Sequence, residues 1–158
     1  MIDDADLTYL RRCADLAEQA LEGGNGPFGS LVVLDGEVRF EDHNRETETG
    51  DATRHPEFEI ARWAAGALTP EERDRAVVYT SGEHCAMCSA AHAWVGLGRI
   101  VYAVSSAQLD RWRAEWGLDA APVTTLAIGQ VAPGVAVDGP APALEDRMRE
   151  LHRRSSRS

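Results

Sequence analysis

SLVVLDGEVRF, at residues 30–40, contains two apolar runs separated by the pair Asp35-Gly36. A tight two-residue hairpin turn needs a positive φ at its central positions, and Asp and Gly tolerate this conformation better than most residues. The stretch therefore predicts two antiparallel strands, at about Ser30–Leu34 and Glu37–Glu41.

On both sides of this hairpin the apolar pattern becomes helical. Before it, apolar residues recur at helical spacing from Leu7 to Leu21, and Gly23 and Gly24 then end the helix. Strands and helices alternate after the hairpin, which indicates an α/β fold, and we predict a three-layer α/β/α sandwich with a five-stranded mixed sheet. The later helices are expected at about Pro56–Ala67, Ala86–Val95, Ser106–Trp116 and Ala143–Leu151, and the later strands at about Arg75–Thr80, Ile100–Val104 and Thr124–Ile128.

Length and charge narrow the class of function. The chain has 158 residues, and we expect residues 1–158 to form a single domain. A net charge of −10 argues against a nucleic-acid partner, because binding to the phosphate backbone needs clustered Lys and Arg. The basic cluster from Arg147 to Arg157 is interpreted as a solvated helix end, with residues 146–158 forming a flexible tail.

The ends of the chain and its cysteines point to a cytoplasmic protein. No stretch approaches the length of a membrane span, and the polar start MIDDADLTYL does not resemble a signal peptide. Three cysteines, an odd number, do not indicate a disulfide framework. Two of them, Cys85 and Cys88, form a C-x-x-C pair, which in a cytosolic protein is typical of metal binding or redox chemistry.

Two short segments, 55–57 and 83–88, carry metal-ligand chemistry. The imidazole of His55 and the thiolates of Cys85 and Cys88 make three protein ligands, the set of a catalytic zinc site whose fourth position is open to water. All three lie at the starts of expected helices, where the helix dipole favours thiolate. Glu57, two residues after His55, is close enough to move a proton without being a ligand. We expect one zinc ion per chain and a catalytic role for Glu57.

A structural zinc site is the alternative interpretation. Cys85, Cys88, His84 and His92 would supply four ligands and leave no position for water. His92 lies four residues after Cys88 on the same expected helix. The chain would then be a non-catalytic, zinc-stabilised interaction module. The segment His55–Glu57 favours the catalytic set.

The ordered motifs resemble the cytidine deaminase-like superfamily of zinc nucleobase deaminases. They lie closest to its branch of guanine deaminases and tRNA adenosine deaminases. The resemblance implies a homodimer and an enzyme that hydrolyses a ring C–N bond and releases ammonia. Its expected substrate is a free nucleobase or a related aminated heterocycle, such as a guanine-like purine, a pyrimidine or a triazine. A tRNA adenosine deaminase is the alternative, which the acidic charge disfavours. The matching motifs are PFG at Pro27–Gly29, Asn44, H-x-E at His55–Glu57, Y-T-S at Tyr79–Ser81 and E-x-C-x-M-C at Glu83–Cys88.

The resemblance also assigns substrate-binding positions and a proton carrier. Several of these positions have a structural alternative, such as a turn for Asn44, packing for Phe28 and Trp94, and surface exposure for His84. Guanine deaminases have an acidic residue in the segment corresponding to 110–119, so Asp110, Glu115 and Asp119 are candidates for a second proton carrier, with a solvated helix face as the alternative role. We select Glu115 as the candidate. The substrate-binding residues implied are Asn44, Phe28, Pro56, Glu83, His84 and Trp94.

Three positions depart from the family pattern. Pro56 stands where the family usually has Ala, and proline has no backbone N–H to donate to a substrate acceptor. His84 stands where the family usually has Pro. After Trp116 the chain has no Phe, Trp or Tyr to match the aromatic residue with which guanine deaminases close the pocket. We therefore expect guanine to be a poor or secondary substrate.

Overall fold

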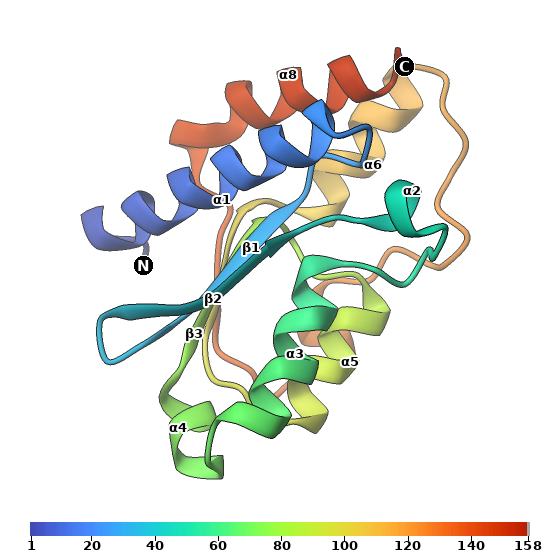
Figure 1. The fold of residues 1–158 in the computed structure, drawn as a ribbon. Helices are drawn as coiled ribbons and strands as arrows, with labels where there is room; N and C mark the ends of the chain where they lie inside the picture. The colour runs from blue at the N-terminus through green and yellow to red at the C-terminus, as the bar shows by residue number, and fades with distance from the viewer. Residues whose placement is uncertain (158) are drawn as a thin grey trace.

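The expected hairpin forms the first two strands of the sheet in the computed structural model, which describes residues 1–157 (Figure 1). β1 (Gly29–Leu34) pairs antiparallel with β2 (Glu37–His43). The turn between them has positive φ at both central residues, 52° at Asp35 and 79° at Gly36. This is the backbone conformation for which the Asp-Gly pair is suited.

The sheet has five strands in the order β2-β1-β3-β4-β5 and is mixed, as predicted. β3 (Val77–Gly82) runs antiparallel to β1, and β4 (Ile100–Val104) runs parallel to β3. The fifth strand, β5 (Val137–Asp138), runs parallel to β4.

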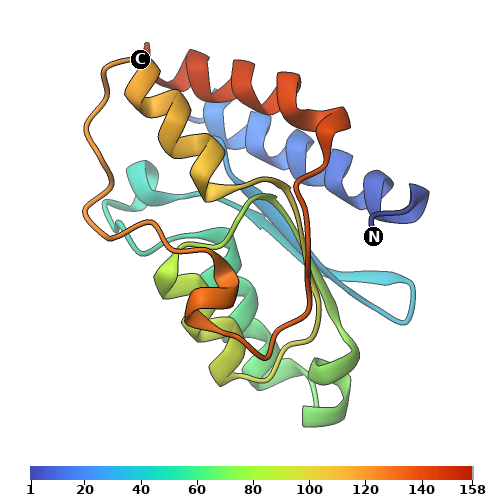
Figure 2. The same ribbon diagram turned by 180° about the vertical axis from the view of Figure 1, so that it is seen from behind.

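The prediction of a fifth strand at Thr124–Ile128 is wrong. The segment after α6 is irregular and leads into the short helix α7 (Ile128–Val131), as Figure 2 shows. The place beside β4 is taken by Val137, which pairs with Ile100. β-branched residues alone do not form a strand, because a strand also needs a partner and a buried face.

Helices cover both faces of the sheet. α1 (Asp4–Glu22), α6 (Ser106–Glu115) and α8 (Glu145–Ser155) lie on one face, and α3 (Pro56–Ala67) and α5 (Ala86–Trp94) lie on the other (Figures 1 and 2). Shorter helical segments complete the structure: α2 (Glu46–Thr49), α4 (Pro70–Arg75), α7 and a 3-10 turn at Pro142–Leu144.

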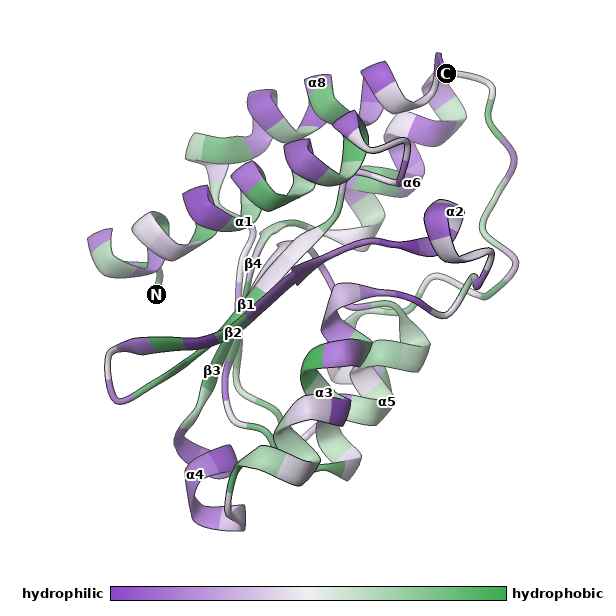
Figure 3. Cartoon of the chain, viewed as in Figure 1, coloured by the Kyte–Doolittle hydropathy of each residue, from purple (hydrophilic) through white to green (hydrophobic). Residues whose placement is uncertain are grey.

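Strand β1 joins the two halves of the core. Its side chains alternate, so that Leu31 and Val33 pack in the cluster with α1 and α8, whereas Val32 and Leu34 pack in the cluster with α3. All six residues of β1 are buried, whereas most of β2 at the sheet edge is exposed and hydrophilic (Figure 3). A one-residue slip of register would exchange the two apolar sets, so packing on both faces fixes the register.

The prediction of a flexible tail over residues 146–158 is wrong for the part up to Ser155, which is helical. The last residue of that range, Ser158, lies outside the described residues. α8 packs on the sheet through Met148 and Leu151, which are buried. Arg147 of this helix forms ion pairs with Asp15 at 2.7 Å and Glu18 at 3.2 Å, both on α1. Arg147 therefore has acidic partners in a helix that is far away in sequence. Among the described residues, no helix has the length and apolar composition needed to cross a membrane.

α8 also carries a buried histidine ring. His152 packs edge-on against Phe28, with ring centroids 5.0 Å apart, and its Nε2 atom is buried without a hydrogen-bond partner in the described chain. Burial, together with the nearby charge of Arg113, lowers the pKa of His152 to about 4.

This histidine should make the fold sensitive to acid. An unfolded histidine titrates near pH 6.5, so between pH 7 and pH 5 the unfolded chain takes up a proton that the folded chain does not. Unfolding free energy should fall by about 2 kcal/mol over this range through His152 alone. His152→Phe keeps an aromatic ring against Phe28 but has no group that titrates. The variant should therefore lack the part of the fall in unfolding free energy that comes from His152. Urea unfolding at both pH values tests this, and an identical pH dependence in variant and wild type would contradict it.

Candidate active site

The three predicted metal ligands lie at the starts of two neighbouring helices. His55 is the N-cap of α3, Cys85 is the N-cap of α5, and Cys88 lies in the first turn of α5. Nδ1 of His55 is 3.6 Å from Sγ of Cys85 and 3.5 Å from Sγ of Cys88. In the described part of the chain, these side chains form the group of His, Cys, Asp or Glu residues able to hold a metal ion, with ligand atoms within 4.8 Å of one another.

The geometry of this group fits zinc. A tetrahedral zinc ion with Zn–N of about 2.0–2.1 Å and Zn–S of about 2.3 Å separates a nitrogen from a sulfur ligand by about 3.5 Å. Both observed separations, 3.6 and 3.5 Å, agree with that value.

The electrostatics of the group also fit a cation. Hydrogen bonds from Cys88 and then from His55 lower the pKa of the Cys85 thiol to about 4. Hydrogen bonds to Cys85 and then to Glu46 raise the pKa of His55 to about 10, and contact with Cys85 raises the pKa of Cys88. The cluster therefore contains a thiolate, and its members share protons. A divalent cation bound at the same place would displace these protons.

The alternative structural zinc set is not assembled. His84 and His92 pack edge to face with ring centroids 5.5 Å apart, and Nε2 of His92 is 2.7 Å from the carbonyl oxygen of Gly98. His92 is therefore engaged with the backbone at the end of its own helix.

Glu57 lies next to the ligand cluster, and a hydrogen bond from strand β3 holds its carboxyl group in place. Its side chain is in the first turn of α3, the residue is 6% exposed, and Oε1 accepts a hydrogen bond of 2.9 Å from the Thr80 hydroxyl. Thr80 in turn accepts a 2.8 Å hydrogen bond from Ser30. Oε2 is 3.9 Å from Sγ of Cys88. Burial raises the pKa of Glu57, which suits a carboxyl group that has to take up and release a proton.

Asn44 is buried beside the ligand cluster and is bound to Glu46, a residue that sequence reasoning missed. The Asn44 amide donates to Oε1 of Glu46 at 2.9 Å, and its carbonyl oxygen accepts from the Glu46 backbone N–H at 3.0 Å. The same Oε1 atom lies 2.7 Å from Nε2 of His55. Glu46 lies in a polar, loop-like stretch with several acidic residues. Nothing in the sequence distinguishes Glu46 from the others.

Phe28 and Pro56 each lie next to another predicted site residue. The Phe28 ring is half-buried between Gly26, beside Asn44, and Gly82, at the end of β3. Pro56 is buried at the first position of α3, directly after His55. Their role in substrate binding stays a prediction.

The other predicted site residues have different surroundings. His84 is 1% exposed, so the alternative of surface exposure is wrong, and neither ring nitrogen has a hydrogen-bond partner in the described chain. Trp94 is 88% exposed, so it does not pack in the core of its own chain. Glu115 is exposed, and its carboxylate pairs with Arg149 of α8 at 2.8 Å, not with a group near Glu57.

Glu83 braces two helices. One carboxylate oxygen accepts from the backbone N–H of Ser106 at 3.0 Å, and the other accepts from that of Ile128 at 2.9 Å. These are the first residues of α6 and α7, whose N–H groups have no partner within their own helix. The structure thus gives Glu83 a supporting role, and its contact with substrate stays a prediction.

Comparison with known families identifies the class of protein. The family model of the cytidine and deoxycytidylate deaminase zinc-binding region matches residues 3–104, which is more than half of the chain. The chain belongs to this family of zinc-binding deaminases, as its motifs predicted. Zinc is therefore its cofactor, and His55, Cys85 and Cys88 are the residues that would hold it.

The curated relatives differ in the substrate for which they are named. The chain is 34% identical over 110 residues to a probable cytosine deaminase of Schizosaccharomyces pombe, covering 68% of this chain and 65% of that protein. It is 36% identical over 97 residues to the guanine deaminase of Bacillus subtilis, covering 61% and 62%. It is 37% identical over 86 residues to a tRNA-specific adenosine deaminase of Agrobacterium fabrum, covering 54% and 57%. The chain thus spans less than two thirds of the length of each relative.

A solved structure confirms the fold. The guanine deaminase of Nitrosomonas europaea superposes with a TM-score of 0.76 over 100% of this chain and 87% of that one. Its sequence identity is 21%, so this likeness shows the fold alone.

Proposed function

We propose that the chain is a zinc-dependent hydrolytic deaminase that converts an aminated heterocycle, such as a free nucleobase, to its oxo form and releases ammonia. One observation carries the proposal. A buried carboxyl group, Glu57, lies beside the cluster of His55, Cys85 and Cys88 without joining it. A purely structural metal site has no use for such a group.

Residues of the chain have separate roles in the proposed reaction. When bound, zinc supplies a water molecule with a lowered pKa and so a nucleophile near neutral pH. Glu57, held by Thr80, passes one proton of the attacking water to the ring nitrogen and then passes the second proton of that water to the departing amine, which leaves as ammonia. Asn44 offers an amide to the ring from the side of the pocket bordered by Phe28.

The expected substrate is small and uncharged. The chain has a net charge of −10, which does not favour a polyanion. Pro56 has no backbone N–H to donate to the substrate. A substrate that lacks an acceptor at this position therefore leaves no donor of the protein unpaired. Guanine is therefore expected to be a secondary substrate, and a smaller or differently substituted aminated ring a better one.

A screen for ammonia release from guanine, cytosine, adenine and amino-triazines tests this proposal. Pro56→Ala restores the backbone donor, and one such hydrogen bond is worth about 0.5–1.5 kcal/mol. The ratios of kcat/KM between substrates should therefore change by a factor of a few to about ten. A wild-type preference for guanine by a wide margin would overturn the substrate assignment. Unchanged ratios in Pro56→Ala would show that Pro56 does not set the preference.

A tRNA adenosine deaminase is the second candidate, favoured by the relative from Agrobacterium fabrum. Two arginines of α8 count against it, because Arg147 and Arg154 pair with Glu18 on α1. Inosine formation in tRNA, with binding that weakens steeply as salt rises, would support this candidate instead.

A further inference from the structure

Glu46 links the imidazole of the ligand cluster to the amide of Asn44. Its Oε1 atom lies 2.7 Å from Nε2 of His55 and accepts from the Asn44 amide at 2.9 Å. Its backbone N–H donates to the carbonyl oxygen of Asn44 at 3.0 Å. One residue thus contacts both a metal ligand and an expected substrate-binding group.

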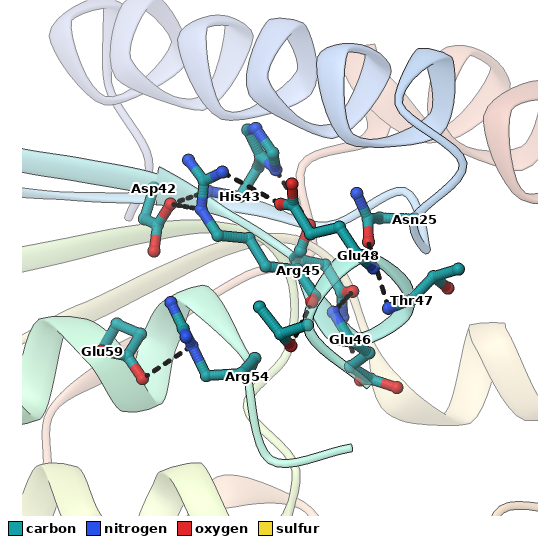
Figure 4. A network of polar contacts seen from close by, with 11 residues as sticks. Asn25, Asp42, His43, Arg45, Glu46, Thr47, Glu48, Arg54 and Glu59 are labelled. Carbon is teal, nitrogen blue, oxygen red and sulfur yellow. Dashed lines mark hydrogen bonds and ion pairs between the residues drawn. The ribbon is translucent and has the colours of Figure 1, made fainter. Parts of the chain in front are cut away.

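The backbone of Glu46 is itself held in place. α2 has four residues, and Oδ1 of Asn25 accepts from the backbone N–H of Thr47 and of Glu48, both at 3.1 Å (Figure 4). Arg45, the N-cap of this helix, donates to Asp42 at 2.9 Å and to Glu48 at 3.0 Å. The short helix is therefore anchored to the end of β2 and to the loop after α1, so its side chains are presented from a fixed base.

The contact with Glu46 assigns the proton on the His55 ring. A carboxylate can only accept a hydrogen bond, so Nε2 of His55 must be the donor. Nδ1 faces Sγ of Cys85 and of Cys88, so it is the ring nitrogen that would bind the metal once zinc displaces the proton shared there. Metal-binding histidines commonly need such a partner to hold their tautomer and ring orientation.

The same contact assigns the orientation of the Asn44 amide. Its nitrogen faces the Glu46 carboxylate and its oxygen faces the Glu46 backbone N–H, so exchanging the two would place like groups together. Among the described residues, the hydrogen bond to Glu46 occupies one N–H of this amide. In this orientation, the group of Asn44 with which a substrate could bond is a donor, the second N–H.

We propose that Glu46 is a positioning residue. It holds His55 with the proton on Nε2, so that Nδ1 faces the metal, and it turns Asn44 so that an N–H reads an acceptor on the substrate ring. The part concerning Asn44 rests on the proposed function. The part concerning His55 rests only on zinc binding.

Zinc affinity of the full chain, measured by competition with a chelator, tests the His55 part without substrate. Glu46→Ala should weaken zinc binding by about 10–100-fold, the usual effect of removing a partner of a metal-bound histidine. Glu46→Gln should lose less, because an amide oxygen still accepts from Nε2. Glu48→Ala is the matched control: Glu48 lies in the same helix and its carboxylate is bound to Arg45. The control should bind zinc as tightly as wild type.

A second readout separates positioning from simple loss of structure. 1H–15N NMR spectra of the zinc-loaded chain should show a slowly exchanging, hydrogen-bonded Nε2–H of His55 in wild type and in Glu46→Gln, and a faster-exchanging Nε2–H in Glu46→Ala. Equal zinc affinity in Glu46→Ala and wild type would overturn the proposal. An equal loss in Glu48→Ala would also overturn it, because folding of α2 would then be responsible. Failure of the chain to deaminate any heterocycle would refute the proposed function but leave these two measurements unaffected.

Discussion

Glu57→Gln should abolish most of the turnover while zinc stays bound at wild-type stoichiometry. The amide is nearly the same size as the carboxyl group and still accepts the 2.9 Å hydrogen bond from Thr80. It cannot take up and release a proton, and proton transfer by a positioned group contributes about 10²–10⁴-fold to rate. We therefore expect kcat to fall by about 10²–10⁴-fold.

The measurement pairs kcat on the best substrate with metal analysis of the same sample. Glu59→Gln is the matched control on the same helix, since Glu59 pairs with Arg54 at 3.3 Å instead of contacting the cluster. The control should keep both its turnover and its zinc. Near-normal turnover in Glu57→Gln would exclude Glu57 as the proton carrier and leave the proposed mechanism without its base.

Removal of any one of the three ligands should empty the zinc site. His55→Ala, Cys85→Ala and Cys88→Ala each leave two protein ligands, too few for the three-ligand pattern of a catalytic zinc site. Zinc content should fall from about one per chain to near zero, and the melting temperature should fall with it, because bound metal stabilises the folded state.

His92→Gln is the control for this series. Its amide N–H can still donate to the Gly98 carbonyl oxygen, which lies 2.7 Å from Nε2 of His92. Zinc content by elemental analysis should be unchanged in His92→Gln. Retention of zinc in His55→Ala together with its loss in His92→Gln would show that the structural ligand set is the real one.

The parts of the site that could be predicted from the sequence are local. His55 and Glu57 lie two residues apart at a helix start, and Cys85 and Cys88 lie three residues apart at another. Within one helical turn, spacing alone determines which side chains share a direction, so these four residues were identified before the fold was known.

Other features depended on contacts that only the folded chain makes. Glu46 was hidden among several acidic residues until folding placed it 2.7 Å from His55, and Glu83 became a brace only because Ser106 and Ile128 begin helices next to it. Arg147 and Arg154 of α8 pair with Glu18 of α1, from which they lie 129 and 136 residues away in sequence. No periodicity in the sequence encodes such pairings.

By itself the sequence determined the hairpin, the order of most helices and strands, the cluster of metal ligands and the class of chemistry. The first three depend on turn geometry, apolar period or short spacing, which act over a few residues, and the class of chemistry follows from the family that the motifs resemble. Tertiary structure decided the place of the fifth strand, the packing of α8 and the tie between Glu46, His55 and Asn44. These depend on which surfaces meet after the chain has collapsed, because a strand needs a partner, a charge needs a counter-ion and a buried polar group needs a hydrogen bond.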